Sequence, residues 1–141
     1  MATTPNTRVP RWFWIVAVLA LLWEAAGVAS YLGQVYGATA TDENQRRLIE
    51  STPAWVTGAY AVAVFSGLAG AVALLLRRRW AVALLTLSLI AALLQFGWVI
   101  LFSEAARLLG SGALVLPVVV MIVAALLVAF ARSARRRGWL R

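Results

Sequence analysis

Four long apolar stretches, separated by short polar connections, make up most of this chain. Each stretch holds at least 19 residues, against the roughly 20 that a helix needs to cross about 30 Å of hydrocarbon. A helix satisfies its own backbone hydrogen bonds in lipid, whereas an open strand does not. The pattern therefore predicts an all-α, polytopic membrane protein, a bundle of four transmembrane helices. The expected helices cover residues 12–36, 53–76, 80–102 and 113–131.

The first stretch also has features of a secretory signal. Arg8 and Arg11 precede the apolar run, and the small residues at 27–29 imitate a cleavage site. The apolar character continues past that site to Tyr36, however, and Glu24 is unusual in the region before it. We therefore expect the stretch to be retained as the first transmembrane helix.

Composition supports a membrane protein with a single domain over residues 1–141. Apolar residues make up 63% of the chain, charged residues only 13%, and the mean hydropathy is +0.87. A soluble domain would carry about a quarter charged residues. The absence of cysteine and histidine argues against a zinc site, a cysteine nucleophile or a histidine proton relay. We expect no enzyme activity, no cofactor and no metal.

The arginines are distributed unevenly, and this predicts the orientation. If there are four spans, ten of the thirteen arginines fall on the side of the two termini and the second connection, against Arg46, Arg47 and Arg107 on the other. Such a bias places the arginine-rich side in the cytoplasm, so we expect both termini inside, in a bacterial inner membrane. The flanking positions favour lipid phosphate over nucleic acid as the anionic partner. The expected contacts with anionic lipid are Arg77, Arg78, Arg79 and, in the basic tail 132–141, Arg132, Arg135, Arg136 and Arg137.

Glu24 is the one acidic residue inside an apolar stretch. A charged side chain at mid-bilayer costs on the order of 3 kcal/mol, so it should face protein or water rather than lipid. It belongs to a seam of small and polar residues at alternating steps of three and four, which form one face of a helix. The seam comprises Ala17, Ala20, Glu24, Gly27, Tyr31 and Gln34.

Possible polar neighbours of Glu24 lie at similar depth in other helices. At about 1.5 Å per residue, Glu24 lies roughly 18 Å from the cytoplasmic side, Ser66 roughly 15 Å and Gln95 roughly 22 Å. Glu24, Tyr31, Ser66 and Gln95 therefore form a candidate polar site within the membrane, which could bind a proton or a cationic substrate. The alternative is structural, with Glu24 protonated and these residues forming hydrogen bonds between helices.

Small residues in the second stretch predict close helix packing. Ala63, Gly67 and Ala71 recur every four residues, a spacing that lets two helix backbones approach each other. Gly27 offers a similar surface in the first stretch. Between these stretches, residues 41–51 either form a short helix with Glu–Arg pairs at i, i+4 or serve as a solvated linker.

Several segments resemble a group of small four-helix inner-membrane proteins of Gram-negative bacteria. The resemblance rests on WFWIVAVLALLWEAAGVASYLGQV, TPAWVTGAYAVAVFSGLAG, RRRWAVALLTLSL and the ending ARRRGWLR. It implies a four-helix membrane fold, and proteins of this group are sometimes automatically labelled sugar transporters. An amide is common in the group where this chain has Glu24.

Two functions are compatible with these patterns, and we expect the first of them, with the second as the alternative. Small size, short loops and the lack of catalytic groups favour an accessory, scaffold or assembly subunit of a membrane complex. Glu24 favours instead a small-solute or proton-coupled transporter that uses this carboxyl as its ionisable site. The strong charge bias opposes antiparallel pairing of two copies, so we expect a parallel homo-oligomer or a subunit of a larger complex.

Overall fold

Four long apolar helices form the body of the protein in the computed structural model, which describes residues 8–36, 42–103, 107 and 110–141. They are α1 (Arg11–Val35), α3 (Ala54–Leu75), α4 (Ala81–Phe102) and α6 (Val115–Arg136). A helix of this length spans about 33 Å, enough to cross the hydrocarbon of a bilayer. The sequence prediction of four apolar membrane-spanning helices is confirmed at this level, and the chain has the features of a multi-pass membrane protein.

Two short elements lie between the long helices. Helix α2 (Glu43–Ser51) begins after Asp42, whose side chain accepts a hydrogen bond of 2.8 Å from the backbone N–H of Gln45. Arg47 Nε lies 3.2 Å from Glu43 Oε1, one of the i, i+4 pairs expected there. The 3₁₀ turn η1 (Ser111–Leu114) precedes α6. Over the described ranges every regular element is helical, while Thr41 and Glu104 lie outside them.

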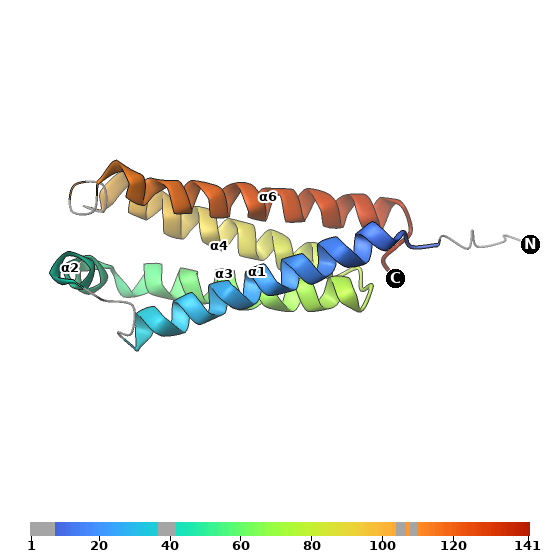
Figure 1. Ribbon diagram of the computed structural model, residues 1–141, viewed down its shortest axis with the longest axis horizontal. Coiled ribbons are helices and arrows are strands. Elements are labelled where there is room, and N and C mark those ends of the chain that lie inside the picture. The colour runs from blue at the N-terminus through green and yellow to red at the C-terminus, as the bar shows by residue number, and fades with distance from the viewer. Residues whose placement is uncertain (1–7, 37–41, 104–106, 108–109) are drawn as a thin grey trace, which may run out of the picture.

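The long helices pack in chain order: α1 against α3, α3 against α4, and α4 against α6. In Figure 1, α1 and α6 come together where α1 begins and α6 ends, and they diverge toward α2. We call these two ends of the molecule the terminal end and the α2 end. The loop between α3 and α4 also lies at the terminal end, so the basic segments gather there.

The packed core fills the terminal half of the molecule. Close helix contact is possible because small side chains face one another, and Ala17, Ala71, Ala81 and Ala131 are all fully buried. Gly70 allows α3 to approach α4 closely, since a Cβ there would lie 3.3 Å from the backbone nitrogen of Leu85. Nearer α2, a much smaller buried cluster of alanines remains. The molecule is therefore tightly packed at the terminal end and less tightly packed at the α2 end.

The last residues of the chain close the terminal end. Helix α6 continues through Arg136 rather than ending near 131, and Gly138 (φ 75°) then turns the backbone. The N–H of Trp139 donates to the carbonyl of Ala134 at 3.0 Å, a Schellman motif with glycine at its usual position. The turn brings Trp139 and Leu140 into the core beside Phe13. Most of the predicted tail 132–141 is therefore helix followed by a buried turn.

Helix α3 ends in the same motif without glycine. Arg77 has φ 56°, and the N–H of Arg78 donates to the carbonyl of Ala73 at 2.8 Å. Arg77 also forms two hydrogen bonds with the last residues of the chain. Its carbonyl accepts from the N–H of Arg141 at 2.6 Å, and its Nε donates to the carbonyl of Trp139 at 2.8 Å. The α3–α4 loop and the chain terminus are thus joined.

Candidate functional site

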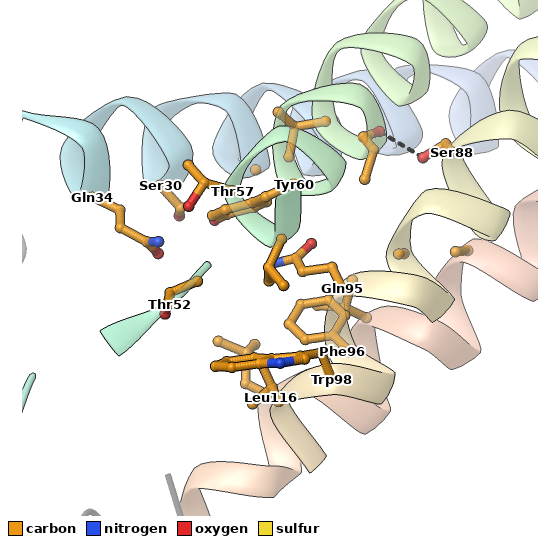
Figure 2. Close-up of a pocket in the computed structure, with 18 of the residues that line it drawn as sticks. Ser30, Gln34, Thr52, Thr57, Tyr60, Ser88, Gln95, Phe96, Trp98 and Leu116 are labelled. Carbon is orange, nitrogen blue, oxygen red and sulfur yellow. Dashed lines mark hydrogen bonds between the residues drawn. The ribbon is translucent and has the colours of Figure 1, made fainter. Parts of the chain in front are cut away.

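A cavity of about 390 Å³ lies between the long helices in the half nearer α2. All four long helices line it, and Leu48 and Ile49 of α2 lie at its outer rim. Figure 2 shows Ser30, Gln34, Thr57 and Tyr60 on one side, with Phe96, Trp98 and Leu116 on the other. One wall, from α1 and α3, thus carries several polar side chains among apolar ones. The opposite wall, from α4 and α6, is largely apolar.

Glu24 lies at the inner limit of this cavity, and only 8% of the residue is exposed. Its carboxyl is directed at Gly67 of α3, where a Cβ would lie 2.6 Å from Glu24 Cδ and would overlap the carboxyl oxygen. The absence of a side chain at residue 67 therefore creates the space that the carboxyl occupies. Within the described part of the chain, this carboxyl makes no hydrogen bond and no ion pair.

Glu24 marks the boundary between the core and the cavity. On α1 the next buried residue toward the terminal end is Ala20, which belongs to the packed core. On α4 the same change occurs between Leu85, which is in the core, and Ser88, which lines the cavity. On both helices, buried residues on the terminal side of the Glu24 carboxyl belong to the packed core, and residues on the α2 side line the cavity.

Ser88 of α4 also converges on Gly67. Its Oγ would lie 2.9 Å from a Cβ at that position, and it donates a hydrogen bond of 2.6 Å to the backbone carbonyl of Ala63 (Figure 2). This bond joins α4 to α3. Because a serine hydroxyl has a single hydrogen, Ser88 offers only its lone pairs to a group beside Glu24.

Gln95 is the second buried polar residue of α4 that lines the cavity, at 7% exposure. Its Oε1 is buried and has no hydrogen-bond partner among the described residues. Buried polar atoms in proteins are nearly always paired, so an orphaned carbonyl oxygen beside a cavity indicates a missing donor.

The structure brings together part of the candidate polar site and separates the rest. Glu24 and Gln95 line the same cavity, whereas Tyr31 and Ser66 do not. Tyr31 packs edge-on against Tyr60 and Phe65, with ring centroids 5.3 and 5.8 Å apart. Ser66 donates to the carbonyl of Val62 within its own helix.

The residues expected to mediate packing lie at helix interfaces. Ala63, Gly67 and Ala71 are buried along α3, and a Cβ at Gly27 would touch Val64 at 3.4 Å. Gly67 also shapes the polar site, which its small size alone did not indicate.

Several cavity residues escaped the sequence analysis. Thr57 and Tyr60 of α3 line the cavity, as do Phe96 and Trp98 of α4. A usable signal was present, because residues 57, 60, 64 and 67 follow steps of three and four along one helix face. The aromatic residues of α4 gave no such signal, since tryptophan near a helix end is typical of a membrane interface.

The arginines expected to contact lipid have different surroundings. Arg132, Arg135 and Arg136 are exposed and border a shallow pocket on α6. Arg78 and Arg79 are also exposed, whereas Arg77 is half-buried. Arg137 lies 5.2 Å from the centre of the Trp139 ring, in cation–π geometry. Arg77 and Arg137 therefore have partners within the protein.

Comparison with protein families, curated proteins and solved structures finds no match to this chain.

Proposed function

We propose that this membrane protein binds a small organic solute in the cavity between its helices and acts as a small-solute transporter, with Glu24 as its ionisable site. The observation that carries the proposal is the unpaired, buried carboxyl at the inner limit of a cavity of about 390 Å³. Binding sites for small molecules have this size, a largely apolar lining and a few convergent polar groups. Ionisable residues within a membrane commonly mark substrate or proton pathways.

The closure of one end supports transport in particular. The core and the buried turn at Trp139 and Leu140 fill the terminal half, whereas the cavity reaches α2. A transporter that works by alternating access needs a site accessible from one side while the other side is closed. A packed terminal half and a cavity near α2 support the proposal of such a site.

The accessory or scaffold function remains the competing proposal. A scaffold stabilises itself and its partners by packed surfaces, and a cavity with a buried carboxyl adds nothing to that role. The scaffold therefore explains the apolar outer faces but gives no reason for the space around Glu24 and Gln95.

We further propose that the terminal end faces the cytoplasm of a bacterial inner membrane, where the exposed arginines contact anionic lipid. The sequence bias of ten arginines to three supports this orientation. Since the chain has no cysteine, single cysteines can be labelled without background. A membrane-impermeant maleimide applied to intact cells should label Glu50→Cys in α2, whereas Arg136→Cys should react only after lysis. The reverse pattern would overturn the orientation.

Protection from labelling tests whether the cavity binds solutes. Ser30 lines the cavity and is exposed, so Ser30→Cys in reconstituted vesicles should react with a water-soluble maleimide. We expect at least one of 4-phenylbutylamine, 4-phenylbutanol, 4-phenylbutyrate and glucose to slow this reaction, while Glu50→Cys reacts at an unchanged rate. Equal rates for all four compounds, together with a stoichiometric foreign subunit in a mild-detergent pull-down, would favour the scaffold.

A further inference from the structure

The cavity lacks a positive charge to balance Glu24. Among the described residues that line it, Glu24 alone bears a formal charge, and none is an arginine. An ionised carboxyl away from water is costly unless a positive group is bound to it. The balancing charge must therefore come from a bound proton or from a ligand.

Two polar side chains of α4 that line the same cavity as Glu24, those of Ser88 and Gln95, present hydrogen-bond acceptors to it. Ser88 uses its hydrogen on the carbonyl of Ala63, and Oε1 of Gln95 has no partner within the described ranges. Together with the carboxyl, they present acceptors from two helices, α1 and α4, to the same cavity. A ligand that satisfies them needs N–H or O–H groups, and an ammonium group supplies three N–H donors with the missing charge.

The cavity wall formed by α4 and α6 favours a ligand with an apolar hydrocarbon part. Phe96 and Trp98 face the space from α4, and Leu116 borders it from α6 (Figure 2). Aromatic rings and aliphatic side chains bind hydrocarbon, and an aromatic face also attracts a nearby cation. A highly polar solute such as a sugar would leave its hydroxyl groups unpaired against this wall.

We infer that the ligand of this cavity is a protonated amine on an apolar body, with its ammonium group at Glu24 and its hydrocarbon against Phe96, Trp98 and Leu116. The inference rests on the proposed solute-binding function and specifies its ligand class. It predicts that charge and donor count at the head group, rather than the hydrocarbon alone, determine affinity.

The test uses compounds that share one apolar body. In vesicles containing the full chain with Ser30→Cys, 4-phenylbutylamine at neutral pH should halve the labelling rate at a concentration about tenfold or more below that of 4-phenylbutanol. The carboxylate 4-phenylbutyrate should be weaker still, because it adds a second negative charge. The trimethylammonium analogue, which keeps the charge but has no N–H, should fall between the amine and the alcohol.

Glu24→Gln in the same background should bring the amine down to the level of the alcohol. The exposed carboxyl change Glu50→Gln is the matched control and should leave the preference intact. Continued protection by the alcohol in Glu24→Gln shows that the cavity is still folded. If the alcohol fails as well, Glu24→Asp replaces it, because a shortened carboxylate should keep the preference for the amine.

The outcomes separate this inference from the function on which it rests. An amine and an alcohol of equal potency, or a preference that survives Glu24→Gln, overturns the amine assignment and leaves a solute-binding cavity. Failure of every compound to protect Ser30→Cys overturns the proposed function itself.

Discussion

The carboxyl of Glu24 occupies the volume that a side chain at residue 67 would fill. A Cβ on Gly67 would lie 2.6 Å from Glu24 Cδ and 2.9 Å from Ser88 Oγ. Three helices therefore meet around one missing side chain. The polar site depends on this glycine as directly as on the acid itself, and the pair can be tested by reciprocal substitution.

Gly67→Ala should lower stability because the new methyl group displaces the carboxyl into a packed interface. Overpacking of this kind costs about 1–3 kcal/mol. The free energy of unfolding, measured by SDS titration in mixed micelles, should fall by that order. Gly58→Ala is the control, because a Cβ there meets nothing within 4 Å. Adding Glu24→Ala to Gly67→Ala should recover most of the loss, and a strictly additive double variant would contradict the steric explanation.

Ser88→Ala should cost more than Thr86→Ala, although both residues lie on α4. The Ser88 hydroxyl donates across to α3, whereas Thr86 Oγ1 donates to Val82 in the same helix. Hydrogen bonds between helices in membranes average about 0.6 kcal/mol, with an upper range near 1.7 kcal/mol. We expect a loss in this range for Ser88→Ala in the same unfolding assay and a smaller one for Thr86→Ala. Equal losses would show that the bond to Ala63 does not join the helices.

The buried turn at the chain terminus should contribute to the stability of the whole fold. Leu140 is 1% exposed, and Leu140→Ala should cost about 2–5 kcal/mol, as for other buried leucines. Leu126 lies on the outer face of α6 and is 63% exposed, so Leu126→Ala makes a matched control with little expected effect. Thermal unfolding in detergent measures both. Comparable midpoints for the two variants would mean that the terminal turn does not stabilise the helices.

At residue 77, the glycine variant should be more stable than the alanine variant, which is the reverse of the usual order. Its φ of 56° is a conformation that costs a residue with a side chain about 1–2 kcal/mol relative to glycine. Both Arg77→Ala and Arg77→Gly lose the hydrogen bond to Trp139, but glycine removes the backbone strain. Arg77→Gly should therefore be more stable than Arg77→Ala by about 1 kcal/mol. At Arg78, which has an ordinary φ, alanine should be at least as stable as glycine, and the same order at both positions would contradict the argument.

Long uninterrupted apolar stretches made the four long helices predictable from the sequence. The spans were apparent because lipid requires about 20 consecutive apolar residues, a constraint that acts locally along the chain. The seam of α1 was visible because its steps of three and four are also a local pattern along the chain. Ala17, Ala20 and Glu24 are its buried residues in the structure. Of the two alternatives for residues 41–51, a short helix or a linker, the structure has the helix, over Glu43–Ser51.

Features that depend on contacts between distant residues were not predictable. The burial of Trp139 and Leu140 requires Gly138 to reverse the chain and Phe13 to receive it, and charge counting over 132–141 indicated only a basic tail. Tyr31 and Tyr60 illustrate the same limit. Both are helical and aromatic, yet only Tyr60 reaches the cavity, because the rotation of each helix is set by its neighbours.

The divergence of α1 from α6 bears on the route by which the proposed amine would reach the cavity. Trp23 and Ala26 on one helix, and Val120 and Ala124 on the other, border the cavity on flanks that lipid would surround. A hydrocarbon-rich amine would then enter from the bilayer, so its concentration in the lipid, rather than in water, would set the occupancy. Its apparent affinity would follow its partition coefficient, and adding empty vesicles would weaken binding by diluting the ligand into more membrane.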